Sequence, residues 1–241
     1  MARLAITWLG HSTFLVGTPG AKQLLFDPWL TGNPACPAEY KKPPRADLIL
    51  ASHGHFDHIG DLVPCARASG ATVIGAYELC DWLGRKGIQN LAPMNKGGSQ
   101  EVGSLRITMT DARHSSGYVD ASATPTDGSG HMLYMGEPAG FVVRLEDGRA
   151  IYYAGDTALF GDMRLIGQMY APEIAFLPIG GRFTMDPSAA AIACELLGVR
   201  QVVPMHWGTF PLLTGTPSEL KTRLAGTRVE VLELKPGETA D

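Results

Sequence analysis

The sequence predicts a mixed α/β fold, and three observations support this. Short apolar segments separated by turn residues open the chain at Leu4–Trp8, Thr13–Val16 and Gln23–Phe26, which is typical of strands joined by hairpins. Strand-like and helix-like segments then alternate, as in a mixed sheet with outer helices. The 241 residues contain no solenoid-type repeat and no long linker, so we expect one domain over residues 1–241.

Composition and charge limit the classes of function. Hydrophobic residues make up 45% and charged residues 18% of the chain, which is ordinary for a globular protein. The net charge of −4 gives no sign of a nucleic-acid partner, which would favour a basic face. The first residues resemble a strand more than a signal peptide, and no apolar stretch is long enough to predict a membrane span. Four cysteines without paired spacing predict reduced, mostly buried thiols and a cytoplasmic location: Cys36, Cys65, Cys80 and Cys194.

The first half of the chain alternates strands and helices after the opening hairpins. Residues 31–46 are rich in proline and polar groups, which predicts a surface loop. Apolar segments predict further strands at Leu48–Ser52 and Ala71–Ile74. Apolar residues at helical spacing predict a helix over 59–66, and a second helix is expected over Glu78–Lys86.

The second half repeats the order of strands followed by helices. Its predicted strands are Leu105–Thr110, Phe141–Leu145, Ala150–Tyr153, Glu173–Pro178, Gln201–Met205 and Arg228–Leu234. Its predicted helices are Gly161–Tyr170, one with Asp186 as N-cap and Pro187 in the first position, and one from Ser218. Residues 93–99 predict a loop, and residues 115–138 predict a second loop that is long enough for a lid. His131 lies in this second loop, and we expect it to be solvated and not a ligand.

A motif of metal-ligand type follows one of these strands, with the sequence His-Gly-His-Phe-Asp-His at 53–58. Imidazole and carboxylate groups bind zinc, iron or manganese and leave positions open for water. His53 and His55 project to the same side of an extended chain, whereas Asp57 and His58 diverge and suit a second ion. The glycine between the first two histidines allows a tight turn. The alternative is a helix start with incidental histidines, but such a buried cluster is costly without a metal.

Three other predicted strands also end at residues of ligand type, namely His114, Asp156 and His206. Because scaffolds often gather distant ligands at the ends of several strands, we expect these side chains to lie near the 53–58 motif. No G-x-S-x-G segment supports a serine nucleophile.

The 53–58 motif after an apolar strand resembles that of the metallo-β-lactamase superfamily. Within it, the chain is most similar to small bacterial metal-dependent hydrolases related to the ascorbate-phosphate lactonases. This similarity depends on Leu9–Phe14, Gly155–Thr157 and Pro204–Pro211, and covers nearly the whole chain. The resemblance implies an αββα sandwich, in which two sheets pack face to face between outer helices.

The resemblance also implies a dinuclear metal centre with seven ligands. One ion would be held by His53, His55 and His114. The other would be held by Asp57, His58 and His206, and Asp156 would bridge both ions. Two such ions lower the pKa of a bound water from about 15.7 to about 7 and so activate it as a nucleophile. Asp57 would also be catalytic by orienting that water. Zinc is the first expectation and manganese the second, although iron and nickel also suit nitrogen-rich sites.

His11 lies outside this ligand set, in a Gly-His-Ser turn between two strands. It is expected to be catalytic as a donor or proton shuttle beside the metals, and the alternative is a turn histidine bonded to backbone. Asp27 either orients a metal-bound histidine or simply forms an Asp-Pro turn, and the sequence leaves both open. One of Lys96, Arg113 and Arg182 is a candidate partner for a charged substrate, although most such side chains are only solvated.

The sequence therefore predicts a metal-dependent hydrolase that acts on a small ester, lactone, thioester or phosphoester. The alternatives are a nuclease of the same fold and a non-catalytic, metal-dependent binding module. The expected partner is a small-molecule substrate, with no nucleic acid or membrane, and a homo-oligomer is compatible with the sequence.

Overall fold

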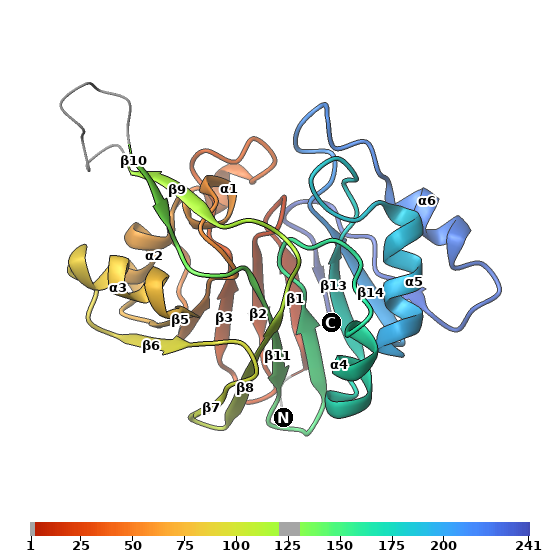
Figure 1. Cartoon of the computed structure of the whole chain (residues 1–241), viewed down its shortest axis with the longest axis horizontal. Helices are drawn as coiled ribbons and strands as arrows, with labels where there is room; N and C mark the ends of the chain where they lie inside the picture. Colours follow the sequence, from red (N-terminus) through yellow and green to blue (C-terminus); the bar gives the residue numbers. More distant parts are fainter. Residues whose placement is uncertain (1–2, 121–130) are drawn as a thin grey trace.

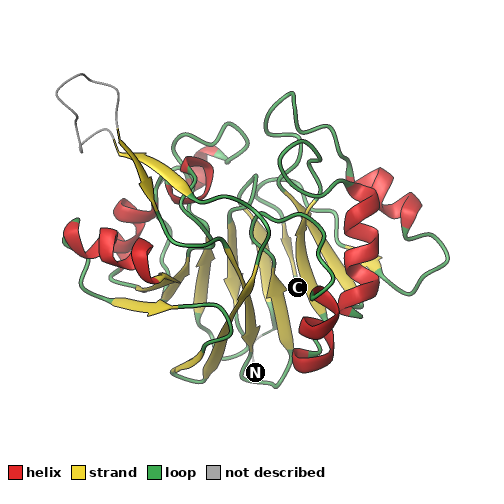
Figure 2. Cartoon of the chain, viewed as in Figure 1, coloured by secondary structure: helices red, strands yellow, loops and turns green. Residues whose placement is uncertain are grey.

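Two large sheets pack face to face in the computed structural model, which describes residues 3–120 and 131–241 (Figures 1 and 2). Within these ranges the strands form two seven-stranded sheets and one two-stranded ribbon. Helices cover the outer face of each sheet. This arrangement confirms the predicted αββα sandwich.

The first sheet contains the N-terminal strands. Its order is β16 (Thr239–Ala240), β1 (Ala5–Trp8), β2 (Phe14–Gly17), β3 (Gln23–Phe26), β4 (Leu48–Leu50), β5 (Thr72–Ala76) and β6 (Leu91–Met94). β1 to β3 are antiparallel, as hairpins require, whereas β3 to β6 are parallel and need crossovers. The helices of this half are α1 (Phe56–Ile59), α2 (Leu62–Ser69) and α3 (Tyr77–Arg85), and a short 3₁₀ turn, η1, covers Ala38–Tyr40.

The second sheet is also mixed. Its order is β15 (Glu230–Val231), β14 (Gln201–Met205), β13 (Ile174–Pro178), β12 (Ala150–Tyr153), β11 (Ala139–Arg144), β8 (Leu105–Asp111) and β7 (Ser99–Val102). Its helices are α4 (Met163–Tyr170), α5 (Pro187–Leu197) and α6 (Pro217–Arg223). As predicted, Asp186 caps α5 by accepting a hydrogen bond from the backbone N–H of Ala189, and Pro187 occupies the first turn.

Buried apolar side chains hold the four layers together. One cluster lies between the two sheets and joins Phe14 and Phe26 of the first sheet to Tyr153 and Phe176 of the second. Two further clusters fill the spaces between each sheet and its helices. Burial of this apolar area is the main force that fixes the sheets relative to each other, and therefore also fixes the loops at their ends.

Several predicted boundaries were wrong. The loop predicted over 115–138 contains the ribbon of β9 (Gly117–Asp120) and β10 (His131–Tyr134), while its residues 121–130 lie outside the described residues. His131 is exposed, as predicted, but it lies in β10. The helix predicted over 59–66 is split into α1 and α2, and the predicted loop over 93–99 is shortened by the end of β6 and the start of β7.

The four cysteines are free and buried, as their spacing suggested. Burial raises the pKa of the Cys36 thiol to about 11 and that of the Cys65 thiol to about 12. Such thiols are poor nucleophiles and poor metal ligands at neutral pH. In the described part of the chain, no helix combines the length and apolar character needed to cross a bilayer.

Candidate metal centre

The predicted ligands meet at one edge of the sandwich, near α1 at the top of Figure 1. The 53–58 motif begins in the loop after β4 and ends in α1, and the segments after β8, β12 and β14 carry His114, Asp156 and His206. His11 comes from the turn between β1 and β2. The structure therefore brings together all seven predicted ligands and His11.

The first group consists of His53, His55 and His114, with one imidazole nitrogen from each within 4.8 Å of the others. His53 Nε2 lies 2.9 Å from His55 Nδ1. Burial lowers the pKa of all three side chains, and that of His53 falls well below its ordinary value. Neutral imidazoles carry the lone pair that a metal ion requires, so this group is suited to hold one ion.

The second group contains Asp57, His58 and His206, together with Asp156. His206 Nε2 lies 3.0 Å from Asp156 Oδ2, and His58 Nε2 lies 3.3 Å from the same oxygen. His114 of the first group is 3.6 Å from it. The carboxylate of Asp156 therefore stands between the two groups, which is the position expected of a bridging ligand.

Asp27 fixes two of these imidazoles from behind. Its fully buried carboxylate accepts hydrogen bonds from His58 Nδ1 at 2.7 Å, from Ser52 Oγ at 2.5 Å and from Tyr153 Oη at 2.7 Å. Since the Ser52 hydroxyl donates to Asp27, its oxygen accepts from His53 Nδ1 at 2.9 Å. Both rings thus carry their proton on Nδ1 and turn Nε2 toward the centre, as metal-ligating histidines do. Of the two readings left open by the sequence, the geometry favours the orienting carboxylate.

Unpaired buried atoms test whether these residues fit metal ions. In the described part of the chain, His58 Nε2 and Asp156 Oδ1 are buried without a hydrogen-bond partner. Each such atom costs about 1–3 kcal/mol unless another ligand satisfies it. A divalent ion bound by these residues would give such atoms a partner, and the donor set of imidazoles and carboxylates suits divalent ions. The cluster is therefore able to bind metal.

His11 is buried behind Asp57 and does not line the pocket. Its Nε2 lies 3.1 Å from Asp57 Oδ2, and its Nδ1 lies 3.0 Å from Thr209 Oγ1. Burial, then the charge of His206, lowers the pKa of His11 to about 4, so the ring is neutral at pH 7. Burial raises the pKa of Asp57, but the hydrogen bond with His11 and the charge of His58 outweigh it and lower the pKa to about 2. His11 can also reach the second group as a ligand.

Strained backbone is concentrated at this site. His11, Asp27 and His206 have positive φ angles of 56°, 43° and 55°. The left-handed region costs a non-glycine residue about 1–2 kcal/mol, and such strain persists only where the surroundings enforce it. The backbone N–H of His206 donates to the His11 carbonyl at 3.1 Å and links two of these strained residues.

Gly54 has a different role from the one predicted. Its φ is not positive, so the motif needs no turn that only glycine can form. Instead, a Cβ at this position would lie 2.3 Å from Met135 Cβ. Glycine is required because the segment after β10 packs directly against the loop that carries His53 and His55.

A pocket of about 520 Å³ opens onto the centre. Its base is formed by predicted ligands, and its walls are formed by Phe56, Ser115, Gly117, Tyr118, Val119, Met132, Phe183 and Phe210. This wall was not predicted, because its residues come from separate loops and from the β9–β10 ribbon, which was itself not predicted. Ser52 and Tyr153 were also missed as partners of Asp27, since Tyr153 looks like an ordinary core residue of β12.

The candidate cations Lys96, Arg113 and Arg182 do not line this pocket. Lys96 Nζ lies 2.5 Å from Asp111 Oδ1, and Arg113 Nε lies 3.0 Å from Asp111 Oδ2. Arg182 is exposed in the loop after β13. The suggestion that one of them holds a charged substrate therefore gains no support from the geometry.

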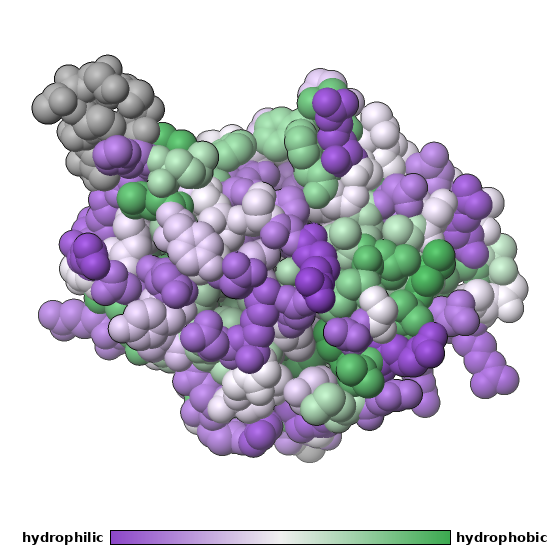
Figure 3. Space-filling model, in the orientation of Figure 1, coloured by the Kyte–Doolittle hydropathy of each residue, from purple (hydrophilic) through white to green (hydrophobic). Residues whose placement is uncertain are grey.

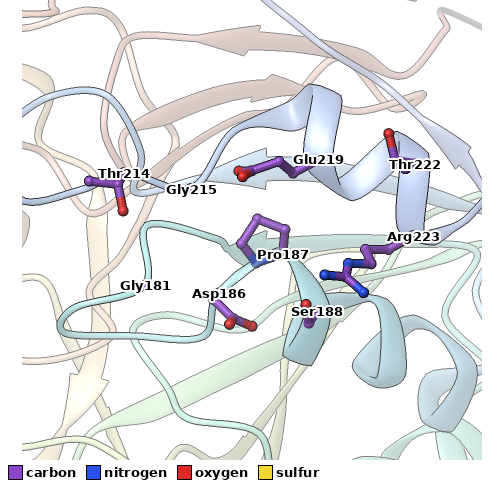
Figure 4. Close-up of a pocket in the computed structure, with 9 residues that line it drawn as sticks. All are labelled: Gly181, Asp186, Pro187, Ser188, Thr214, Gly215, Glu219, Thr222 and Arg223. Atoms are coloured by element: carbon purple, nitrogen blue, oxygen red, sulfur yellow. The ribbon is translucent and has the colours of Figure 1, made fainter.

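A second pocket, of about 650 Å³, lies between the N-terminal end of α5 and the side of α6 (Figure 4). Its carboxylates are used in helix capping, since Asp186 caps α5, and Glu219 forms a capping box with Thr216 at α6. Apart from these two carboxylates, which the caps already use, none of its lining residues is of metal-ligand type. The centre described above is therefore the better candidate for catalysis.

Comparisons with known proteins show the family of this chain. The model of the beta-lactamase superfamily domain matches residues 22–207. A UPF0173 metal-dependent hydrolase of Solibacter usitatus is 51% identical over 97% of this chain and 98% of its own length. Another, from Rubrobacter xylanophilus, is 51% identical over 97% of this chain and 94% of its own length.

A solved structure supports the same family. Igni18, a metallo hydrolase from Ignicoccus hospitalis, superimposes with a TM-score of 0.85 at 36% identity, over 98% of this chain and 97% of that one. The motif after β4, the αββα sandwich and these full-length relatives all indicate the same family. The chain belongs to the beta-lactamase superfamily and, within it, to the UPF0173 family of metal-dependent hydrolases.

Proposed function

We propose that this protein is a dinuclear metal hydrolase that cleaves a small ester, lactone, thioester or phosphoester. The observation that supports it best is the position of Asp156, whose Oδ2 lies within 3.6 Å of imidazole nitrogens from both groups. The first ion would be held by His53, His55 and His114, and the second by Asp57, His58 and His206. When bound, the ions would activate a water and polarise the oxygen of the substrate.

Asp57 and His11 would orient the attacking water, Asp57 directly and His11 through Asp57. Asp57 lines the pocket and lies beside His206, at 3.9 Å from its Nε2. Because its pKa is lowered to about 2, it is ionised at neutral pH and can accept a hydrogen bond from water. His11 would fix the direction of that carboxylate from the buried side.

Removal and return of metal tests the proposal. We expect the purified protein to contain about two divalent ions per chain, with zinc first and manganese second, by elemental analysis. Treatment with a chelator should abolish hydrolysis of a broad panel of esters, lactones, thioesters and phosphoesters, and reloading should restore it. Full activity of the metal-free protein, or no activity of fully loaded protein on any substrate, would contradict a metal-dependent hydrolase.

Replacement of His11 distinguishes an orienting residue from a ligand. We expect His11→Ala to retain both ions but to lose about 10- to 100-fold in kcat, as is typical when a partner of a site residue is removed. His11→Gln places an amide N–H near the position of Nε2 and should recover part of that loss. Metal content and kcat are measured separately for both variants. Loss of one ion in His11→Ala, with no rescue by Gln, would identify His11 as a ligand.

The cytoplasmic location stays a prediction. Four free, buried thiols suit a reducing compartment, and localisation of the tagged protein in its own cells would test this.

A further inference from the structure

The pocket at the metal centre is walled by large apolar side chains that are open to solvent. They come from α1, the β9–β10 ribbon and the loops after β13 and β14, and are Phe56, Tyr118, Val119, Met132, Phe183 and Phe210. In Figure 3, apolar residues gather along the upper edge of the molecule, where these segments meet. Phe56, Val119, Met132 and Phe183 are each more than half exposed. Single exposed apolar side chains are common on protein surfaces. A contiguous cluster of them is not, and it marks a surface that binds a ligand or a partner.

This wall is held in place by contacts outside the pocket. Trp82 Nε1 of α3 donates to Asp120 Oδ2 of β9 at 3.0 Å, and Lys86 Nζ lies 2.6 Å from the same oxygen. The Trp82 ring also packs against Tyr118, with centroids 5.4 Å apart. On the opposite side, Phe210 packs against the buried Trp29 at 5.8 Å. The apolar wall is therefore preformed, which lowers the entropic cost of binding.

No lysine or arginine belongs to this wall among the residues that the structure describes. Residues 121–130, with the sequence ASATPTDGSG, contain neither amino acid. Sites for phosphoryl groups generally use arginine or lysine to balance the charge on the non-bridging oxygens. Here only the metal ions could balance such charge, while the remaining surface favours an uncharged, apolar group.

We propose that the substrate is an uncharged ester, thioester or lactone whose acyl part is apolar and lies against Met132 and Phe183. This inference depends on the proposed hydrolase function. Hydrolysis consumes one water: its oxygen forms a bond to the acyl carbon, and the acyl C–O or C–S bond breaks. The leaving oxygen or sulfur takes a proton from that water, and a carboxylic acid is released. A pocket of about 520 Å³ is within the range used by small ligands.

A series of substrates tests this proposal with the metal-loaded enzyme. We expect kcat/KM to rise at least about tenfold from 4-nitrophenyl acetate to the octanoate, because each buried methylene adds favourable contact. Both 4-nitrophenyl phosphate and bis(4-nitrophenyl) phosphate should be at least about 100-fold poorer than the octanoate. Calorimetry should show that the product octanoate binds at least about tenfold more tightly than acetate.

Matched variants test whether the preference for the octanoate depends on the apolar wall. Met132→Ala and Phe183→Ala should each lower the octanoate-to-acetate ratio of kcat/KM at least about fivefold. Met169→Ala is the control, because Met169 on α4 is as exposed as Met132, at 68%, but lies away from the pocket. It should leave the ratio unchanged.

Different outcomes would contradict the apolar acyl pocket and the hydrolase function. Faster cleavage of a phosphate substrate, or a ratio that depends on neither chain length nor Met132 and Phe183, would overturn the apolar acyl pocket and leave the hydrolase intact. Failure of the loaded enzyme on every ester, thioester, lactone and phosphoester would overturn the hydrolase itself.

Discussion

Asp156→Ala is expected to abolish hydrolysis, with a loss of at least about 10³-fold in kcat/KM, beyond the 10- to 100-fold typical of residues outside the ligand set. Asp156 Oδ2 lies 3.0 Å from His206 Nε2, 3.3 Å from His58 Nε2 and 3.6 Å from His114 Nε2. Removal of its charge leaves the imidazoles of both groups without their shared anion. The content of both metal ions should therefore fall, as measured by elemental analysis after dialysis.

Asp162→Ala is the control for this substitution. Asp162 is exposed before α4, and its side chain makes no capping hydrogen bond there. The control should retain full activity and metal content. If Asp156→Ala kept two ions per chain and wild-type kcat/KM, Asp156 would not be the bridging ligand.

Asp27→Ala is expected to cause the largest loss of stability, about 3–5 kcal/mol in the free energy of unfolding. The substitution leaves His58 Nδ1 and Ser52 Oγ buried without their acceptor. Tyr153 Oη loses one of its two acceptors and keeps the Ser12 carbonyl, at 2.8 Å. It also places alanine at a φ of 43°, which aspartate tolerates better. Urea unfolding of the metal-free protein measures the effect on folding without a contribution from metal binding.

Asp47→Ala gives the matched comparison. Asp47 accepts a hydrogen bond from the backbone N–H of Gln23 at 2.8 Å and lies near Lys22, but it is only partly buried. Its loss should cost about 1 kcal/mol or less. Equal effects of the two substitutions would show that the Asp27 network does not stabilise the core of the site.

The sequence pattern predicted a mixed α/β fold, and the resemblance to the metallo-β-lactamase superfamily implied the αββα sandwich. The pattern also pointed to the ligand-type residues that the structure brings together. This succeeded because the ligands stand at strand ends, where an apolar segment stops and a His or Asp follows, and because the 53–58 motif is local. The positions of His114, Asp156 and His206 then follow from the order of the strands in the second sheet.

The partners and walls of the site could not be predicted in the same way. Tyr153 contacts Asp27 across 126 residues of sequence, and nothing in its strand distinguishes it from a core residue. β9 and β10 pair only with each other in the described structure, and their fixed position depends on long-range contacts such as Trp82 with Tyr118. Such contacts arise from tertiary packing, which local periodicity does not report.

Anomalous diffraction from crystals of the zinc- or manganese-loaded protein is the most direct test of the central claim. Two metal peaks are expected about 3.5–4 Å apart, with Asp156 in contact with both. One peak should lie among His53, His55 and His114, and the other beside Asp57, His58 and His206. A single peak, or metal bound elsewhere while these side chains contact only each other, would contradict a dinuclear centre.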